Sequence, residues 1–146
     1  MNAADVIRQI KDAWGKVPYP GDGDIFTRDS YDDEEITNYF SGTTWRGHKP
    51  ADLRAHSSAF AFFAPAAFHF WLPAFMIAAI EDPEEADVII DHIPASLSGC
   101  SASERWSLFS TPQREAVAAY LRFQIERFSD GVEAERKALR VLEGPG

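Results

Sequence analysis

Seven carboxylates lie within fourteen residues near the start of the chain, and they are the first candidates for chemistry. They are Asp22, Asp24, Asp29, Asp32, Asp33, Glu34 and Glu35. EF-hand calcium loops also gather carboxylates, but they need glycine at position six and glutamate at position twelve. Counted from Asp22, position six is Thr27, so the motif fails and we expect no metal. Asp32 to Glu35 suit the first turn of a helix instead, where carboxylates stabilise the positive end of the helix dipole.

Aromatic and arginine residues flank this acidic cluster in the sequence. Tyr, Trp and Arg are the residue types that dominate binding energy at protein interfaces. Together with the carboxylates they predict a surface that binds a partner. The predicted contact residues are Tyr19, Asp22, Asp24, Tyr31, Asp32, Asp33, Glu34, Trp45 and Arg46. For Tyr31 and Trp45 the alternative is that they fill the edge of the core.

The four histidines are the next candidates, but their spacing matches no metal motif. His48, His56, His69 and His92 form neither HxxxH nor HExxH. No P-loop, nucleophile elbow or dinucleotide fingerprint is present, so we expect no cofactor. For His69, inside an apolar helix, we expect a hydrogen-bonded core histidine, whereas His56 lies on a face that could border a cleft. A hydrolase or other enzyme with both histidines and part of the acidic loop around a cleft is therefore an alternative.

The charge of the chain bears on its partners. The net charge is -9, and residues 1–100 hold 16 of the 23 acidic residues but only 7 of the 14 basic ones. No Lys or Arg occurs between Arg54 and Arg105, which disfavours nucleic acid and favours a basic protein partner. The single cysteine, Cys100, cannot form an intramolecular disulfide, and residues 1–20 lack a secretory signal pattern. These two features predict a cytoplasmic protein.

Residues 60–80, FAFFAPAAFHFWLPAFMIAAI, are apolar apart from His69 and raise the question of a membrane span. A span needs about 20 apolar residues. Pro65 and Pro73 interrupt this run, and an interior proline costs a helix about 3 kcal/mol. We therefore expect one helix to end near Phe63 and a second to run from Pro65 to Ile80, with a kink at Pro73. That second helix is about 24 Å long, short of the ~30 Å hydrocarbon layer, so we expect no membrane span.

Apolar spacing and capping signals predict the remaining elements. The expected helices are 3–14, 31–42 with a capping box of Asp32 and Glu35, 50–63 opened by Pro50, 112–128 capped by Thr111, and 132–142. VIIDHI, residues 88–93, favours a short strand or hairpin near 86–98. The predicted fold is an all-α or nearly all-α single domain over 1–146, with the 65–80 helix surrounded by the helices at 3–14, 50–63 and 112–128.

Short motifs spread over most of the chain resemble a known family. They are VPYPGD (17–22), YDDEEI (31–36), Trp45-Arg46, LPAFM (72–76), the DPEEADVI segment (82–89) and TPQREAV (111–117). The pattern is similar to a family of small bacterial proteins known only as a domain of unknown function. The resemblance implies a bacterial, soluble, stand-alone domain with no assigned activity, and it transfers no catalytic residue. His48 and Lys49 depart from it, because the family has a Ser- or Thr-like cap before Pro50.

These observations favour a non-enzymatic protein-binding module of the inhibitor or immunity type, which covers a basic partner with an acidic face. The enzyme with a His/carboxylate cleft is one alternative. A scaffold component of a larger assembly is another, and an exposed apolar patch of more than a few hundred Å² would be its sign.

Overall fold

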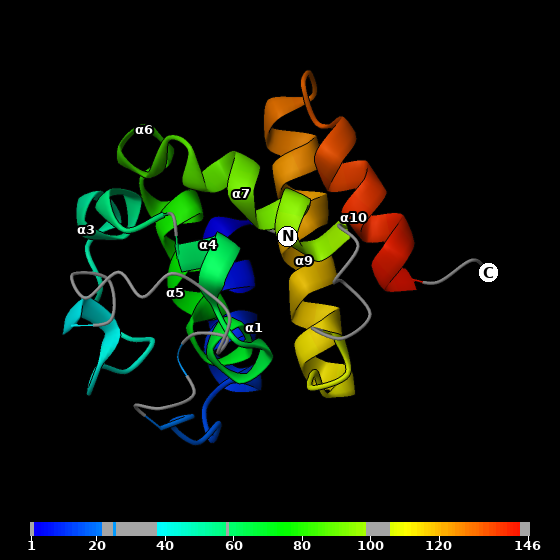
Figure 1. Ribbon diagram of the computed structural model, residues 1–146. Helices are drawn as coiled ribbons and strands as arrows, with labels where there is room; N and C mark the ends of the chain where they lie inside the picture. The colour runs from blue at the N-terminus through cyan, green and yellow to red at the C-terminus, as the bar shows by residue number, and fades with distance from the viewer. Residues whose placement is uncertain (1, 22–24, 26–37, 58, 99–105, 144–146) are drawn as a thin grey trace.

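The computed structural model describes residues 2–21, 25, 38–57, 59–98 and 106–143. These residues form helices and no strand, which confirms the all-α prediction. The helices are α1 (Ala3–Ala13), α3 (Pro50–Ala55), α4 (Ala59–Phe62), α5 (Pro65–Glu81), α6 (Pro83–Ala86), α7 (Ile89–Ser98), α9 (Thr111–Phe128) and α10 (Glu133–Glu143) (Figure 1).

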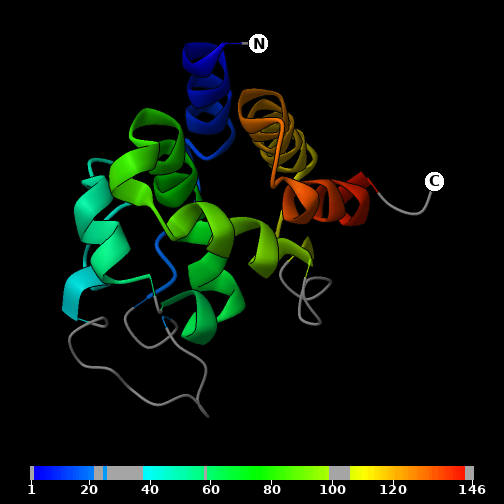
Figure 2. The same cartoon turned by 90° about the horizontal axis from the view of Figure 1, so that it is seen from above.

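Helix α5 lies at the centre of one group of helices, as its uniformly apolar sequence requires. It contacts α1, α3, α6 and α7, and most of its side chains are buried. Helices α9 and α10 form an antiparallel pair on the other side of the molecule (Figures 1 and 2). This pair is joined to the first group by α1, which packs on α9, and by α7, which packs on α10.

Helix α5 continues through Pro73, the residue at which we expected a kink. Proline has no backbone N–H, so the carbonyl of His69, four residues earlier, loses its helical partner. The indole N–H of Trp14 donates to that carbonyl at 2.8 Å, and the Trp14 side chain is fully buried. A side chain from α1 therefore satisfies the acceptor that the proline leaves free.

Gln113 connects three helices at the start of α9. Its Nε2 donates to the carbonyl of Ala13 at the end of α1 (3.2 Å), and its Oε1 lies 2.7 Å from Nε2 of His69 on α5. The same Oε1 accepts the backbone N–H of Ser110, and Ser110 caps α9 in a capping box with Gln113. The predicted cap, Thr111, was thus wrong by one residue, because Ser110 supplies the hydroxyl.

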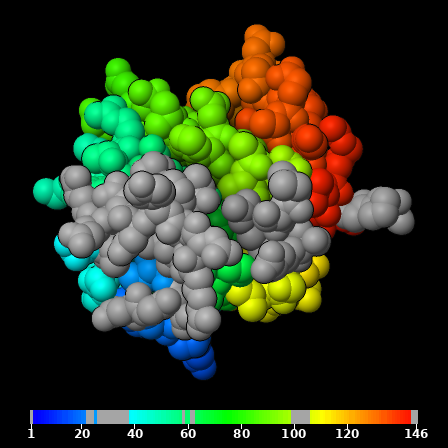
Figure 3. Space-filling view, viewed as in Figure 1, coloured from blue at the N-terminus to red at the C-terminus, as the bar shows by residue number. Residues whose placement is uncertain are grey.

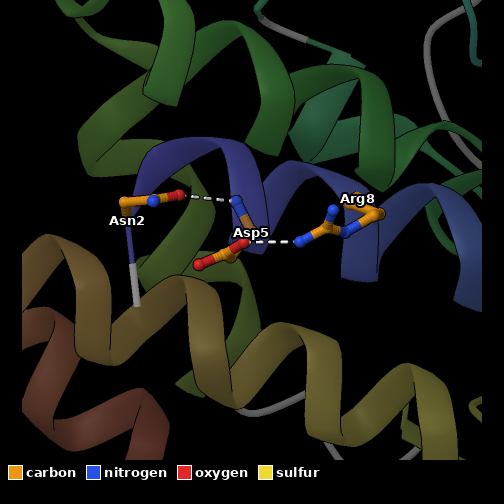
Figure 4. Close-up of polar contacts among 3 residues, drawn as sticks. All are labelled: Asn2, Asp5 and Arg8. Carbon is orange, nitrogen blue, oxygen red and sulfur yellow. Dashed lines mark hydrogen bonds and ion pairs between the residues drawn. The ribbon is translucent and has the colours of Figure 1, made fainter.

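The start of α1 follows the pattern expected of an N-cap. Oδ1 of Asn2 accepts the backbone N–H of Asp5 at 2.9 Å, and Asp5 pairs with Arg8 one turn later (Figure 4). At α3 the cap position is Lys49, which makes no side-chain cap bond.

The helix predicted over 50–63 was wrong in its continuity, because α3 ends at Ala55 and α4 begins at Ala59. His56 ends α3. Its Nδ1 lies 2.8 Å from the carbonyl of Asp52, the acceptor that the backbone N–H of His56 would use in a continuing helix. That N–H turns instead to the carbonyls of Leu53 and Arg54.

The strand or hairpin predicted near 86–98 was also wrong, since this segment forms the end of α6 and all of α7. A short apolar run does not distinguish a strand from a buried helix. The deciding signal is the burial of Ile89, Ile93 and Leu97 at intervals of four residues, a helical stripe that continues past Pro94.

Two further expectations concern the ends of the predicted helices. Residues 38–40 are helical and Gly42 has a φ of +76°, which agrees with a helix stop at this glycine. The capping box of Asp32 and Glu35 lies outside the described residues.

Helix α5 has 17 residues, and no helix in the described part of the chain is long and apolar enough to cross a membrane.

Candidate functional site

The contact residues predicted from sequence divide into two groups. Tyr19, Trp45 and Arg46 belong to the described residues. Asp22, Asp24, Tyr31, Asp32, Asp33 and Glu34 lie outside them. The predicted interface as a whole therefore stays a prediction.

Tyr19 joins the proline-rich loop to the rest of the fold. Its hydroxyl accepts the backbone N–H of Gly42 at 2.9 Å, and its ring meets Phe70 and Trp71 edge-on at 5.8 and 5.9 Å between centroids. It is still 37% exposed. One side of the ring thus anchors the loop while the remainder faces solvent, where a partner can reach it.

Trp45 and Arg46 act as a pair, with one side chain inside and one outside. Trp45 is only 2% exposed, and the exposed Arg46 places its guanidinium carbon 4.1 Å from the centre of the Trp45 ring. The burial of Trp45 agrees with the alternative that this residue fills the edge of the core. A hollow of about 320 Å³ beside the pair is also lined by Lys11, His48 and Glu81, so its charges are mixed.

His48 lies next to Tyr39 and His56 in a small polar cluster. The Tyr39 hydroxyl is 2.7 Å from Nδ1 of His48, and the other ring nitrogen, Nε2, contacts the carbonyl of Thr44. The rings of Tyr39 and His56 stack with centroids 4.2 Å apart. Since Nε2 faces a carbonyl it must carry the hydrogen, and Nδ1 then accepts from the tyrosine. Both nitrogens of His48 are therefore already occupied.

Burial shifts the pKa values of Tyr39 and His48 in this cluster. It raises the pKa of Tyr39 to about 12, with a further increase from the negative charge of Asp52. It lowers the pKa of His48, although the Thr44 carbonyl and Asp52 act in the opposite direction. A neutral tyrosine and a neutral, fully bonded histidine hold the loop in place but are not arranged to transfer a proton.

His69 behaves as the core histidine that its position predicts. Its Nε2 contacts Gln113, and its ring packs against Phe109 and Trp14 with centroids 4.8 and 6.0 Å away. Burial lowers its pKa, and the Gln113 bond partly opposes that change. Among the described residues its neighbours differ from those of His56, so the two histidines share no contact there. Within the described part of the chain, no three His, Cys, Asp or Glu side chains are placed to hold a metal ion.

The structure does bring together acidic residues that are far apart in the sequence. Because α7 packs on α10, the α6–α7 segment lies beside the turn between α9 and α10 (Figure 1). We call the resulting surface the acidic face. Its residues are Asp87 and Asp91 from the first segment and Asp130, Glu133 and Glu135 from the second. All are exposed except Glu135.

Few cations interrupt the acidic face. Nη2 of Arg54 lies 3.8 Å from Glu85, which precedes the acidic face in the chain. Arg127 donates from Nη1 to the Ile80 carbonyl at 3.2 Å, and its guanidinium carbon lies 5.2 Å from the centre of the Phe128 ring. Arg136 and Lys137 follow on α10 and are exposed.

Sequence reasoning missed the acidic face as a possible site. The predicted contact residues included none of residues 81–87 and none of the last helix. The absence of Lys and Arg between Arg54 and Arg105 was a partial signal. Packing of α7 on α10 could not be deduced from it.

A model of one protein family, described as "Family of unknown function (DUF6714)", matches residues 2–143. The chain belongs to this family. The resemblance to a domain of unknown function is thereby confirmed over nearly the whole chain. No curated protein and no solved structure matches it. Membership of DUF6714 assigns no activity, so any function must be argued from the geometry above.

Proposed function

We propose that this member of DUF6714 is a non-enzymatic binding module that covers a basic protein partner with its acidic face. The observation that carries the proposal is the meeting of two acidic segments, α6–α7 and the α9–α10 turn, on one surface. An inhibitor or immunity-type protein that sequesters a basic target works in this way.

The physical basis is long-range attraction between unlike charges. Exposed carboxylates each add little affinity, about 0 to 1 kcal/mol per ion pair. A cluster of one sign raises the rate of encounter with a partner of the other sign and rejects partners of the same sign. The same charges repel nucleic acid, so nucleic acid is not a proposed partner.

The loop residues predicted from sequence form the second part of the proposed interface. Tyr19 and Arg46 are exposed and anchored, which suits them to act as contacts whose ordering is already complete. The carboxylates from Asp22 to Glu34 precede Arg46 in the chain. A cytoplasmic location is part of the same proposal.

The arrangement of the histidines favours binding over catalysis. His48 has both ring nitrogens occupied, and His56 and His69 contact separate sets of neighbours. General acid–base catalysis needs a group within hydrogen-bond reach of the substrate proton and a pKa near the working pH. The described histidines offer no pair of this kind.

The test is capture of a partner from lysate of the source organism by three tagged proteins. The first is the wild type. The second has the acidic face neutralised by Asp87→Asn, Asp91→Asn and Asp130→Asn. The third is a matched control with three exposed carboxylates removed elsewhere by Asp12→Asn, Glu115→Gln and Glu126→Gln.

We expect the wild type and the control to retain one basic protein in stoichiometric amount, and the face variant to lose it. Raising the salt from 0.05 to about 0.5 M should weaken the complex, because screening shortens the reach of the charges. Retention of the same protein by all three forms, or of no protein at low salt, would contradict the proposal.

A further inference from the structure

The acidic face contains a hollow of about 320 Å³ between α6–α7 and the α9–α10 turn. The notch between the green and orange segments at the top of Figure 3 marks this region. Four carboxylates line the hollow together with apolar side chains. They are Asp87, Asp91, Asp130 and Glu135, beside Ile90 and Phe128.

Glu135 distinguishes this hollow from an ordinary solvated acidic surface. Its residue is only 4% exposed, and its Oε2 is buried without a hydrogen-bond partner among the described residues. A buried polar atom without a partner is costly, and native proteins rarely keep one unless a water or ligand meets it. Burial raises the pKa of Glu135, and the nearby charges of Asp91 and Glu133 raise it further, against a contact with its own backbone N–H.

The backbone around the hollow is also unusual. Asp87 has a φ of +47° and Ser129, between Phe128 and Asp130, has a φ of +58°. They are the residues other than glycine with positive φ in the described ranges of the chain. Such conformations cost about 1 to 3 kcal/mol each and cluster at functional sites. Asp87 lines the hollow, and so does Asp130, the residue after Ser129.

We propose that this hollow receives one cationic side chain of the basic partner, with its ammonium or guanidinium group against Glu135 and its alkyl stem against Ile90 and Phe128. The inference rests on the proposed function and names the chemistry of the contact. An organic cation suits the hollow better than a metal ion, because no three of the described carboxylates converge as ligands. Carboxylates and apolar groups that line the same hollow match a head that is charged and a stem that is not.

The hollow can be tested without the partner by using small probes. Nα-acetyl-lysine-N-methylamide supplies the stem and the ammonium, and Nα-acetyl-norleucine-N-methylamide supplies a similar stem without the charge. Putrescine supplies the ammonium of a free polyamine. Each is titrated into the ¹⁵N-labelled full chain while amide chemical shifts are recorded. The proteins are the wild type, Glu135→Gln and, as matched control, Glu84→Gln, which removes an exposed carboxylate outside the hollow's wall.

We expect saturable shifts at Asp87, Asp91, Asp130 and Glu135 with the lysine probe, at a Kd on the order of 10 mM. Glu135→Gln should weaken this binding at least tenfold, which corresponds to about 1.4 kcal/mol, and Glu84→Gln should change it less than twofold. If the amide spectrum of Glu135→Gln differs from that of the wild type outside the hollow, Asp91→Asn is used in its place. This substitution changes an exposed residue that lines the same hollow.

Three results would each overturn the proposal. They are equal responses to the lysine and norleucine probes, shifts that rise linearly without saturation, and binding of the lysine probe that Glu135→Gln leaves unchanged. Tighter binding of putrescine than of blocked lysine would overturn the assignment of the hollow to a partner side chain.

The experiments distinguish a wrong proposal for the hollow from a wrong proposal for the function. If the wild type and Glu135→Gln capture a partner equally, the proposed role of the acidic face stands and only the proposed role of the hollow is wrong. Saturable binding of blocked lysine with no captured partner means the reverse.

Discussion

Glu135 and Trp45 show, at the scale of single residues, that side chains in a charged helix or a short loop can be buried. Glu135 is one of several charged residues of the last helix, yet it is 4% exposed and its Oε2 has no hydrogen-bond partner among the described residues. Trp45 lies in a short loop that suggested an exposed contact, yet it is 2% exposed and covered by Arg46. The unfolding free energies of variants at these two positions test whether each side chain is buried.

Glu135→Gln should stabilise the protein at pH values above the ordinary pKa of a glutamate side chain. Because the pKa of this carboxyl is raised in the folded state by burial, its ionisation opposes folding once the pH passes the unfolded value. Wild-type stability is therefore lost as the pH rises through the folded pKa, and the amide removes that loss. Urea unfolding at pH 4, 6 and 8 should show an advantage for the variant that grows with pH and is smallest at pH 4. An advantage that is the same at all three values would argue against a buried carboxyl, and exposed Glu84→Gln is the control.

Trp45→Ala should cost about 3 to 5 kcal/mol of unfolding free energy, the range for a large aromatic side chain removed from a core. Arg46→Ala should cost less than about 1 kcal/mol, because only an exposed cation–π contact is lost. Urea denaturation of both variants measures the difference. Similar small losses for the two would mean that Trp45 contributes contact surface rather than core.

At the scale of elements, the central helix depends on a neighbour to tolerate its own sequence. Pro73 removes a backbone donor from the middle of α5, and Trp14 of α1 supplies an N–H to the carbonyl left behind. The helical pair α1 and α5 is thus coupled by a specific hydrogen bond in addition to apolar contact. This coupling predicts a non-additive pair of substitutions.

Trp14→Phe should destabilise the protein by about 1 to 3 kcal/mol, because it leaves the buried carbonyl of His69 without a donor. In a Pro73→Ala background the same change should cost less, since the new backbone N–H of residue 73 can bond that carbonyl. A double-mutant cycle by chemical denaturation measures the coupling. Additive costs would show that the indole N–H does not compensate for the proline.

At the scale of the whole molecule, the fold gathers like charges instead of dispersing them. The net charge is -9, and the acidic face joins two segments whose separation along the chain would otherwise keep their carboxylates apart. Clustered like charges destabilise a compact state. Their clustering on one surface agrees with the proposed binding role.

The triple face variant, Asp87→Asn, Asp91→Asn and Asp130→Asn, should therefore be more stable than wild type at low ionic strength, by about 1 kcal/mol or less. The gain should disappear near 0.5 M salt, where the Debye length is only a few Å. Removal of three dispersed carboxylates, Asp12, Glu115 and Glu126, should give a smaller gain. Thermal or urea unfolding at two salt concentrations decides the matter, and an equal gain for both triples would speak against a repulsive cluster.

The sequence by itself determined the helical class, the burial of α5 and most of the helix positions, because apolar periodicity, prolines and caps act within a few residues. It also determined that His69 would be a bonded core histidine. The prediction of a strand where α7 forms was wrong, because a short apolar run fits a strand as well as a buried helix. The prediction of one helix over α3 and α4 was also wrong, because apolar periodicity does not reveal the bond from His56 to the Asp52 carbonyl.

Only the tertiary structure decided that Trp14 would compensate for Pro73, that Trp45 would be buried and that Glu135 would face a hollow with Asp87, Asp91 and Asp130. Each of these features depends on contacts between residues distant in the chain. Local preferences do not encode such contacts, which arise from the way the apolar faces of the helices pack around a common core.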